Sequence, residues 1–277
     1  MTGDLYAAFR RAVDCPEEDI DLGKAALAIA KGEYPNLSID DCLSRLDQLG
    51  RAVDLRLGDE KTPFRIIAAV NMVLFKEQGY EGNRDNYYDP KNSFLNDVIE
   101  RKTGIPITLS VLYMEVARRV GLALHGVGFP GHFLVKYDDG SDVIVIDPFN
   151  QGEILTREDL DRLLKDLYGS NLAYDPQFLE PITKTEILRR LLNNLKIIYL
   201  RTNEPLKALA VLEHLVILDP TSAPDIRDRG LMYEKLECFV QAVEDLENYL
   251  RLAPGADDVA TIEYQLADLR QRAIPIH

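Results

Sequence analysis

Apolar residues recur three and four positions apart through the first ninety residues, which is the spacing of helices that bury one face. Residues 20–30 show this pattern, and residues 39–49 repeat it with Cys42 and three leucines after a possible capping Ser38. Thr62 and Pro63 open a third such stretch, with proline at a first-turn position that it tolerates well. Residues 1–90 are therefore predicted to be mainly helical. A polar loop is predicted over 80–92.

A second kind of pattern begins at Pro106. After a short helix predicted over 93–101, residues 106–120 are apolar around most of a helical circumference. A helix without a polar face is normally buried. We expect this one to be the central helix of the domain.

Alternation at strand spacing replaces the helical pattern after Gly121. Three short β-rich runs cover residues 124–128, 133–137 and 143–146. Asp139 and Gly140 separate the last two runs, and an Asp-Gly pair between apolar runs is a strong hairpin signal. Helical spacing returns over 156–168. The predicted fold class is α+β, in which one buried helix packs on an antiparallel sheet.

The C-terminal third contains an internal repeat of 34 residues. Tyr199 recurs as Tyr233, Ala208 as Ala242, and Pro220 as Pro254. This period, with a small residue where two helices cross and a closing proline, is typical of tetratricopeptide repeats. Residues 185–272 are predicted to form five antiparallel helices, which are two repeats and a capping helix. We expect three parts in all: a helical part (1–90), a core (91–182) and the repeats (183–277).

Composition narrows the possible partners. The 277 residues carry a net charge of −14, which disfavours binding to nucleic acid or to an anionic membrane surface. No stretch has the roughly 20 apolar residues of a membrane span, and residues 1–18 do not resemble a secretory signal. Three widely spaced cysteines, Cys15, Cys42 and Cys238, predict neither a disulfide framework nor a metal site. We expect a cytoplasmic protein without cofactors whose cysteines are buried.

Two residues of the predicted sheet could carry chemistry. Among the four histidines, which include His277, only His132 follows a glycine- and proline-containing turn at a strand entry. Asp147 follows 15 residues later, and a hairpin would place both on neighbouring strands. We expect a hydrogen bond of about 2.6–3.2 Å between them. Such a pair is half of a catalytic triad, although a structural hydrogen bond is the commoner role.

Long motifs support a family resemblance. Gly104–Tyr113, Gly126–Val135 and Ile146–Pro148 resemble the bacterial SirB-one family of transglutaminase-like proteins. The same resemblance extends to Glu33–Pro35, Asn86–Pro90 and Asn92–Asn96. That family carries C-terminal tetratricopeptide repeats. The resemblance implies a transglutaminase/papain-like core in which His132 and Asp147 are two members of a triad. It also places the cysteine nucleophile at Pro106, which has no nucleophilic group.

Two functions follow from this resemblance. The first is a degenerate, non-catalytic protein that binds a protein or peptide partner through the old cleft and the repeats, with a regulatory role. The alternative is a hydrolase or amide-processing enzyme in which His132 and Asp147 act on water or an amide without a cysteine. Tyr87 and Tyr88 either line a ligand cleft or pack under their loop.

Overall fold

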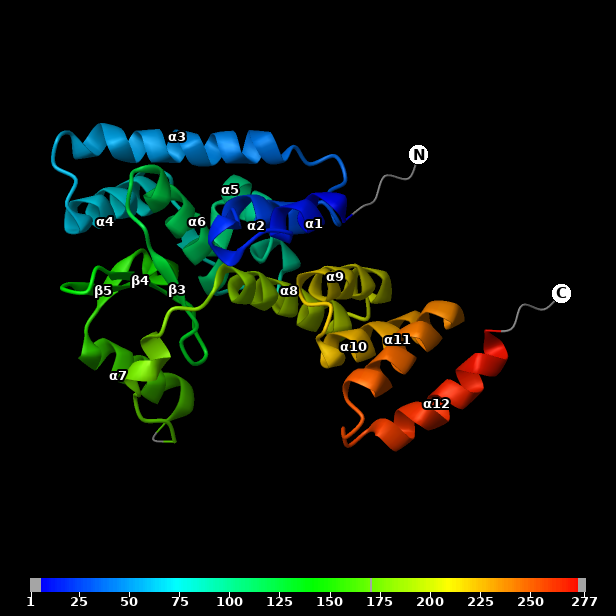
Figure 1. Cartoon of the computed structure of the whole chain (residues 1–277). Coiled ribbons are helices and arrows are strands. Elements are labelled where there is room, and N and C mark those ends of the chain that lie inside the picture. Colours follow the sequence, from blue (N-terminus) through cyan, green and yellow to red (C-terminus); the bar gives the residue numbers. More distant parts are fainter. Residues whose placement is uncertain (1–5, 170, 274–277) are drawn as a thin grey trace. The chain divides into compact units, whose positions relative to one another are not determined.

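A computed structural model describes residues 6–169 and 171–273, so that His277 lies outside the described residues. Residues 11–191 form one compact unit (Figure 1). The segment up to Arg10 joins residues 192–277 in the other unit. The boundary between them falls inside one long helix, α8 (Lys184–Arg201).

The helical half of the first unit follows the apolar pattern of the sequence. Ser38 caps α3 by accepting a hydrogen bond from the Asp41 N–H, as its position predicts. The stretch that begins at Thr62 continues past its α-helix as a π-helical turn, a form that is rare and is enriched at functional sites. The elements are α1 (Ala7–Val13), η1 (Glu17–Asp19), α2 (Leu22–Ala30), α3 (Ile39–Leu57), α4 (Pro63–Asn71), the π-helical η2 (Met72–Glu77), η3 (Pro90–Asn92) and α5 (Leu95–Arg101).

The predicted central helix is α6 (Pro106–Arg119), and its burial confirms the prediction. Val111, Tyr113, Val116 and Ala117 are completely inaccessible to solvent. Helices α2, α3, α4 and α5 contact α6 on one side, and strands β3 and β4 contact it on another. This surrounding explains why the sequence of α6 has no polar face.

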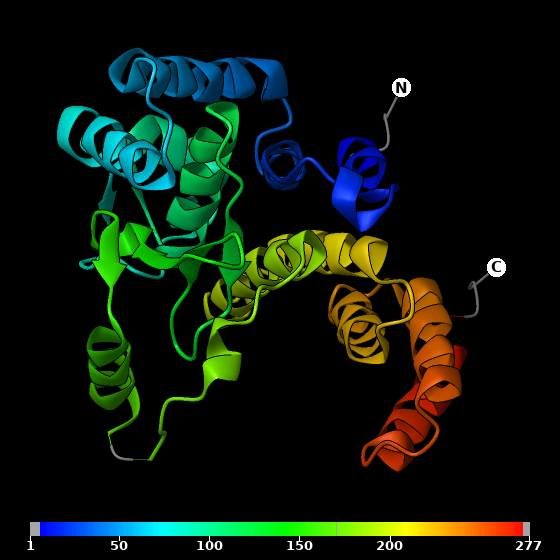
Figure 2. The ribbon, with the colours of Figure 1, turned by 60° about the vertical axis from the view of Figure 1, so that its left-hand side comes forward.

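The antiparallel sheet has the order β3-β4-β5-β6 and consists of β3 (His125–Val127), β4 (Leu134–Asp138), β5 (Val143–Asp147) and β6 (Glu153–Leu155). The first three strands confirm the prediction, and Asp139 stabilises the hairpin turn by accepting from the Asp142 N–H. In Figures 1 and 2 the sheet lies between α6 and α7 (Arg157–Tyr168). Leu134 and Val145 pack against Leu160 and Leu164 of α7.

Three features of the first unit were not predicted. Strand β6 was missed because its residues Glu153 and Ile154 are exposed, so they leave no apolar signal. The polar segment predicted as a loop contains β1 (Glu81–Gly82), which pairs in parallel with β2 (Thr103–Gly104). The sequence also gave no sign of the short 3-10 helices η4 (Pro148–Asn150) and η5 (Pro176–Leu179).

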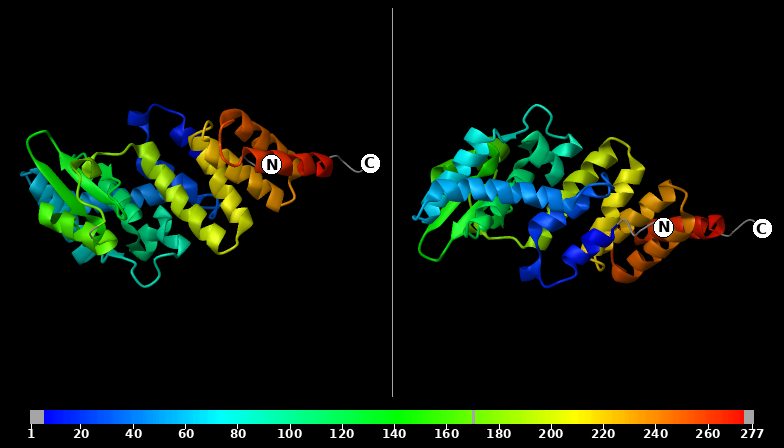
Figure 3. Two further views of the ribbon diagram at one scale, coloured as in Figure 1. Left: turned by 90° about the horizontal axis from the view of Figure 1, so that it is seen from below. Right: turned by 90° about the horizontal axis from the view of Figure 1, so that it is seen from above.

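The repeat helices of the second unit confirm the predicted array of five helices. They are α8, α9 (Pro205–Leu218), α10 (Ala223–Lys235), α11 (Phe239–Leu252) and α12 (Val259–Arg272). Successive helices from α9 to α12 lie side by side (Figure 3). Ala208 and Ala242 have no exposed surface, which is what a close helix crossing requires.

The cysteines differ from the prediction. Cys42 is buried, but Cys15 is exposed and Cys238 is half-buried. Cys15 lies between α1 and η1, in a short connection that has no apolar face to hide it. Separately, none of the helices described within 6–169 and 171–273 is long and apolar enough to cross a membrane.

Candidate active site and adjoining pocket

His132 and Asp147 meet as expected. The His132 Nε2 and Asp147 Oδ2 atoms are 2.9 Å apart. His132 sits in the turn before β4, where Gly131 adopts a positive φ of 67° and the His132 N–H donates to the Phe129 carbonyl. Asp147 ends β5, so the hairpin brings the two side chains together. The ring nitrogen left for chemistry is Nδ1, because Nε2 faces the carboxylate.

The carboxylate of Asp147 has four hydrogen-bond partners. Its Oδ1 accepts from the backbone N–H groups of Phe149 and Asn150 at 3.0 and 3.3 Å. Its Oδ2 accepts from the Asn150 side-chain amide at 2.7 Å, in addition to His132. The side chain is only 1% exposed, so these contacts replace water almost completely. Asp147 therefore shapes the turn that follows β5 as well as orienting the imidazole.

A half-buried asparagine, Asn71, attaches that turn to the helical half. The Asn71 side-chain amide donates to the Gly152 carbonyl at 2.8 Å, and its Oδ1 accepts from the Tyr113 hydroxyl at 2.9 Å. Lys76, on the π-helical turn, donates to the side chain of Gln151. The turn from 147 to 153 is thus held at both ends, by Asp147 within the sheet and by Asn71 from α4.

Pro106 occupies the first position of α6 and is buried, as predicted. The nearest hydroxyl groups along the helix are on Thr108 and Ser110, and both side chains are fully buried. Thr108 donates to the Asn92 carbonyl, and the Ser110 hydroxyl has no hydrogen-bond partner in the described part of the chain. Neither hydroxyl is hydrogen-bonded to His132 there. None of the three cysteines belongs to α6, β4 or β5.

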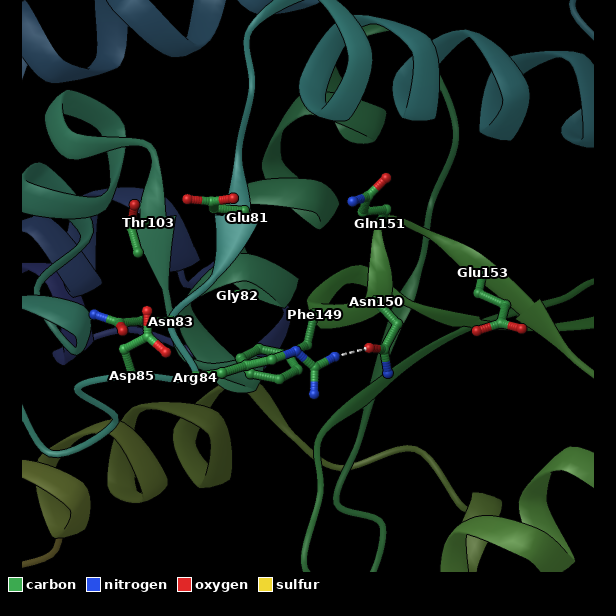
Figure 4. A pocket seen from close by; sticks show the side chains of 10 residues that line it. All are labelled: Glu81, Gly82, Asn83, Arg84, Asp85, Thr103, Phe149, Asn150, Gln151 and Glu153. Carbon is green, nitrogen blue, oxygen red and sulfur yellow. Dashed lines mark hydrogen bonds between the residues drawn. The ribbon is translucent and has the colours of Figure 1, made fainter.

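A pocket of about 550 Å³ adjoins this pair of residues (Figure 4). Asn150, which bonds Asp147, and Phe149, whose ring meets the His132 ring edge-on at 5.9 Å, form one wall. Arg84 extends across the Phe149 ring and donates to the Asn150 side-chain carbonyl. The lining consists of Glu81, Gly82, Asn83, Arg84, Asp85, Thr103, Phe149, Asn150, Gln151 and Glu153.

Sequence reasoning missed this pocket. Its walls come from residues 81–85 and 149–153, which are about seventy positions apart and lie in polar segments without periodicity. Tyr87 and Tyr88, the aromatic candidates from the sequence, do not line it. They are 42% and 57% exposed and contact each other edge-on. Within residues 6–169 and 171–273, no group of three potential ligands is arranged to hold a metal ion.

Comparison with known proteins agrees with the fold. The family described as the transglutaminase-like superfamily matches residues 40–193, and a tetratricopeptide repeat family matches residues 195–267. The chain belongs to the transglutaminase-like superfamily. The predicted combination of such a core with C-terminal repeats is therefore confirmed. No solved structure gives a significant match to the chain.

Bacterial relatives share almost the full length. A UPF0162 protein of Xylella fastidiosa is 38% identical over 268 residues, which is 94% of both chains. A UPF0162 protein of Pseudomonas aeruginosa is 31% identical over 93% of this chain and 94% of its own. A mouse protein named F-box only protein 21 is 38% identical over 108 residues, which cover 36% of this chain and 17% of that one.

Proposed function

We propose that this protein binds a protein or peptide partner, through the pocket beside Phe149 and through the repeat helices, without thiol chemistry. The observation that carries this proposal is the environment of Asp147. Its carboxylate is 1% exposed and accepts four hydrogen bonds, three of them from the turn that forms one wall of the pocket. Such a carboxylate holds the His132 ring and the wall of the pocket in place.

The start of α6 supports the same proposal. The family resemblance implies that the nucleophile would stand where Pro106 stands, and proline offers neither a thiol nor a hydroxyl group. A nucleophile must lie within hydrogen-bond reach of its base, and the hydroxyls of Thr108 and Ser110 have no hydrogen bond to His132 within the described chain. The pocket therefore adjoins a pair of residues that lacks the third member of a triad.

The repeat helices supply the second binding element. Arrays of this kind present extended surfaces to partners. Large apolar side chains remain exposed on four of the five helices: Leu200 (47%), Leu206 (71%), Val240 (53%), Leu252 (40%) and Tyr264 (82%). Contiguous exposed apolar patches are typical of interaction sites, and we infer that these side chains contribute to one.

Affinity capture with full-length variants tests the proposal. The baits are the wild type, a pocket variant (Phe149→Ala), a repeat variant (Leu206→Glu with Val240→Glu) and a control, Asp59→Asn, on an exposed loop. A partner bound by the wild type and the control, but lost by both other variants at unchanged circular dichroism, is the expected result. Equal recovery by all four baits would refute the proposal.

One observation favours hydrolysis as a second candidate. His132 retains 10% exposure and its Nδ1 is not the atom bonded to Asp147, so it could activate a water molecule. Incubation with a peptide library should then give cleavage products that disappear in His132→Gln. Products from both proteins, or from neither, would exclude this candidate.

A further inference from the structure

The pocket beside Phe149 has three carboxylates without partners. Glu81, Asp85 and Glu153 line it, and none of these side chains takes part in an ion pair or a hydrogen bond within the described residues. All three are exposed, so they can reach a ligand at the mouth of the pocket. Exposed carboxylates elsewhere in the described chain are paired in some cases, such as Asp54 and Asp161, and unpaired in others, so these three are distinguished by lining one pocket.

The Phe149 wall of the same pocket already holds a guanidinium group. The Arg84 Cζ atom lies 5.0 Å from the centroid of the Phe149 ring, and the same guanidinium donates to Asn150 Oδ1. An aromatic face attracts cations because its π electrons carry partial negative charge. Figure 4 shows this arginine crossing from the strand side of the pocket to the Asn150 side. This wall thus combines the two features that recognise a guanidinium group, an aromatic face and a carbonyl acceptor.

Two lysines next to the lining already have acceptors. Lys102, which precedes Thr103, donates to the Gln78 side chain at 3.4 Å. Among the described residues Lys76 donates to the Gln151 side chain, at the edge of the pocket. The lining itself contains three carboxylates against the single guanidinium of Arg84. A neutral or anionic ligand would face this excess of negative charge, whereas a cation would relieve it.

We propose that this pocket receives a cationic side chain, arginine or lysine, of a partner protein, and that Arg84 occupies the cation position until the partner binds. This inference rests on the proposed function, since it names the group that the pocket would take. A volume of about 550 Å³ suits a side chain with its flanking backbone. The side-chain amide of Gln151, whose oxygen accepts from Lys76, can donate its N–H groups to that backbone.

Titration of the ¹⁵N-labelled full-length protein with short peptides tests the proposal. The probes are acetyl-Gly-Arg-Gly-amide and its lysine analogue, with citrulline and norleucine analogues as neutral isosteres and guanidinium chloride as the bare cation. We expect the two cationic peptides to shift the amide signals of Gly82, Phe149 and Asn150 with at least about tenfold higher affinity than the neutral peptides or the bare cation. Equal shifts from the citrulline peptide, equal affinity of guanidinium chloride, or no shift from any probe would each overturn the proposal.

Matched variants separate the role of Arg84 from general charge. Arg84→Gln and Lys76→Gln each remove one positive charge, but only Arg84 lies on the Phe149 ring. We expect Arg84→Gln to raise the affinity for the arginine peptide at least about threefold more than Lys76→Gln does. Glu81→Gln and Asp85→Asn should each weaken binding about threefold, whereas Glu263→Gln on α12 should not. An Arg84→Gln effect no larger than that of Lys76→Gln contradicts the displacement.

The peptide titration and the affinity capture can refute the two proposals separately. A partner lost by the pocket and repeat variants, together with no response to the cationic peptides, would leave the binding function standing and refute only the cation class. Shifts from the cationic peptides without any captured partner would support the cation class and refute the proposed binding function.

Discussion

Asp147 is the residue that joins the possible chemistry of the site to its architecture. Its four hydrogen bonds fix the imidazole of His132 on one side and the turn carrying Phe149 and Asn150 on the other. The contact with His132 was predictable because a hairpin of known turn position brings residues 132 and 147 to the same end of two neighbouring strands. The contacts with the turn were not, because the sequence does not reveal that Asp147 caps a 3-10 helix.

Asp147→Asn should lower the free energy of unfolding by about 2–3 kcal/mol. The asparagine amide would replace Oδ1 or Oδ2 and so point a donor at groups that already donate, while the position stays buried. Urea denaturation measures the effect. Asp166→Asn, on the exposed face of α7, is the matched control and should change stability by less than about 0.5 kcal/mol. A similar loss of stability in both variants would show that the hydrogen bonds of Asp147 make no special contribution.

The elements around the site differ in how well the sequence predicted them. Helix α6 and strands β3 to β5 were predictable, since burial on one or both faces leaves a periodic pattern. Strand β6, the β1–β2 pair and the pocket were not, because their residues are polar or exposed and their contacts link segments distant in sequence. The turn between β5 and β6 depends on one such contact, between Asn71 and Gly152.

Gly152→Ala tests that contact. Gly152 has a φ of 74°, and a Cβ atom there would overlap the Asn71 side chain, so alanine adds a clash to backbone strain. Gly140 in the β4–β5 turn has a φ of 86° but open space around it. We expect Gly140→Ala to cost about 1 kcal/mol and Gly152→Ala about 3 kcal/mol or more, measured by urea denaturation. Equal losses of stability would mean that backbone strain alone sets the cost and that the Asn71 side chain moves aside without a penalty.

A buried histidine, His214, gives the second unit a stability that depends on pH. His214 of α9 is buried between the rings of Tyr6 and Phe9, its Nδ1–H donates to the Ala210 carbonyl, and its Nε2 has no partner in the described chain. Burial lowers the pKa of His214 from 6.5 to about 4. The folded protein therefore resists a proton that the unfolded chain accepts below pH 6.5.

Stability should consequently fall as the pH drops from 6.5 towards 4, by about 3 kcal/mol in total for this residue. The neutral imidazole provides its full contribution above pH 6.5. Urea denaturation at several pH values, compared with His214→Gln, measures this contribution as the difference between the two slopes. Parallel slopes for the two proteins would show that His214 titrates normally in the folded state.

At the scale of the whole molecule, two modules share one helix. The superfamily match ends at residue 193 and the repeat match begins at 195, both within α8. The first turns of α8 belong to the core, where Glu17 accepts hydrogen bonds from Lys184 and Thr185 and Arg190 donates to the Gly128 carbonyl. The repeat period predicted the helical array itself. No sequence signal marked how far the core extends along α8, the first helix of that array.

The charge of the whole chain should make its stability depend on salt. A net charge of −14 destabilises the compact state by self-repulsion, and that repulsion is screened when the Debye length falls from about 30 Å at 0.01 M salt to about 10 Å at 0.1 M. We therefore expect sodium chloride to raise Tm by several degrees between these concentrations at pH 7. Chloride is preferable to sulfate, which also strengthens apolar burial. Near pH 4.8, the isoelectric point, the net charge vanishes and the gain should vanish with it. A gain of the same size at both pH values would mean that specific ion binding, and not self-repulsion, sets the response.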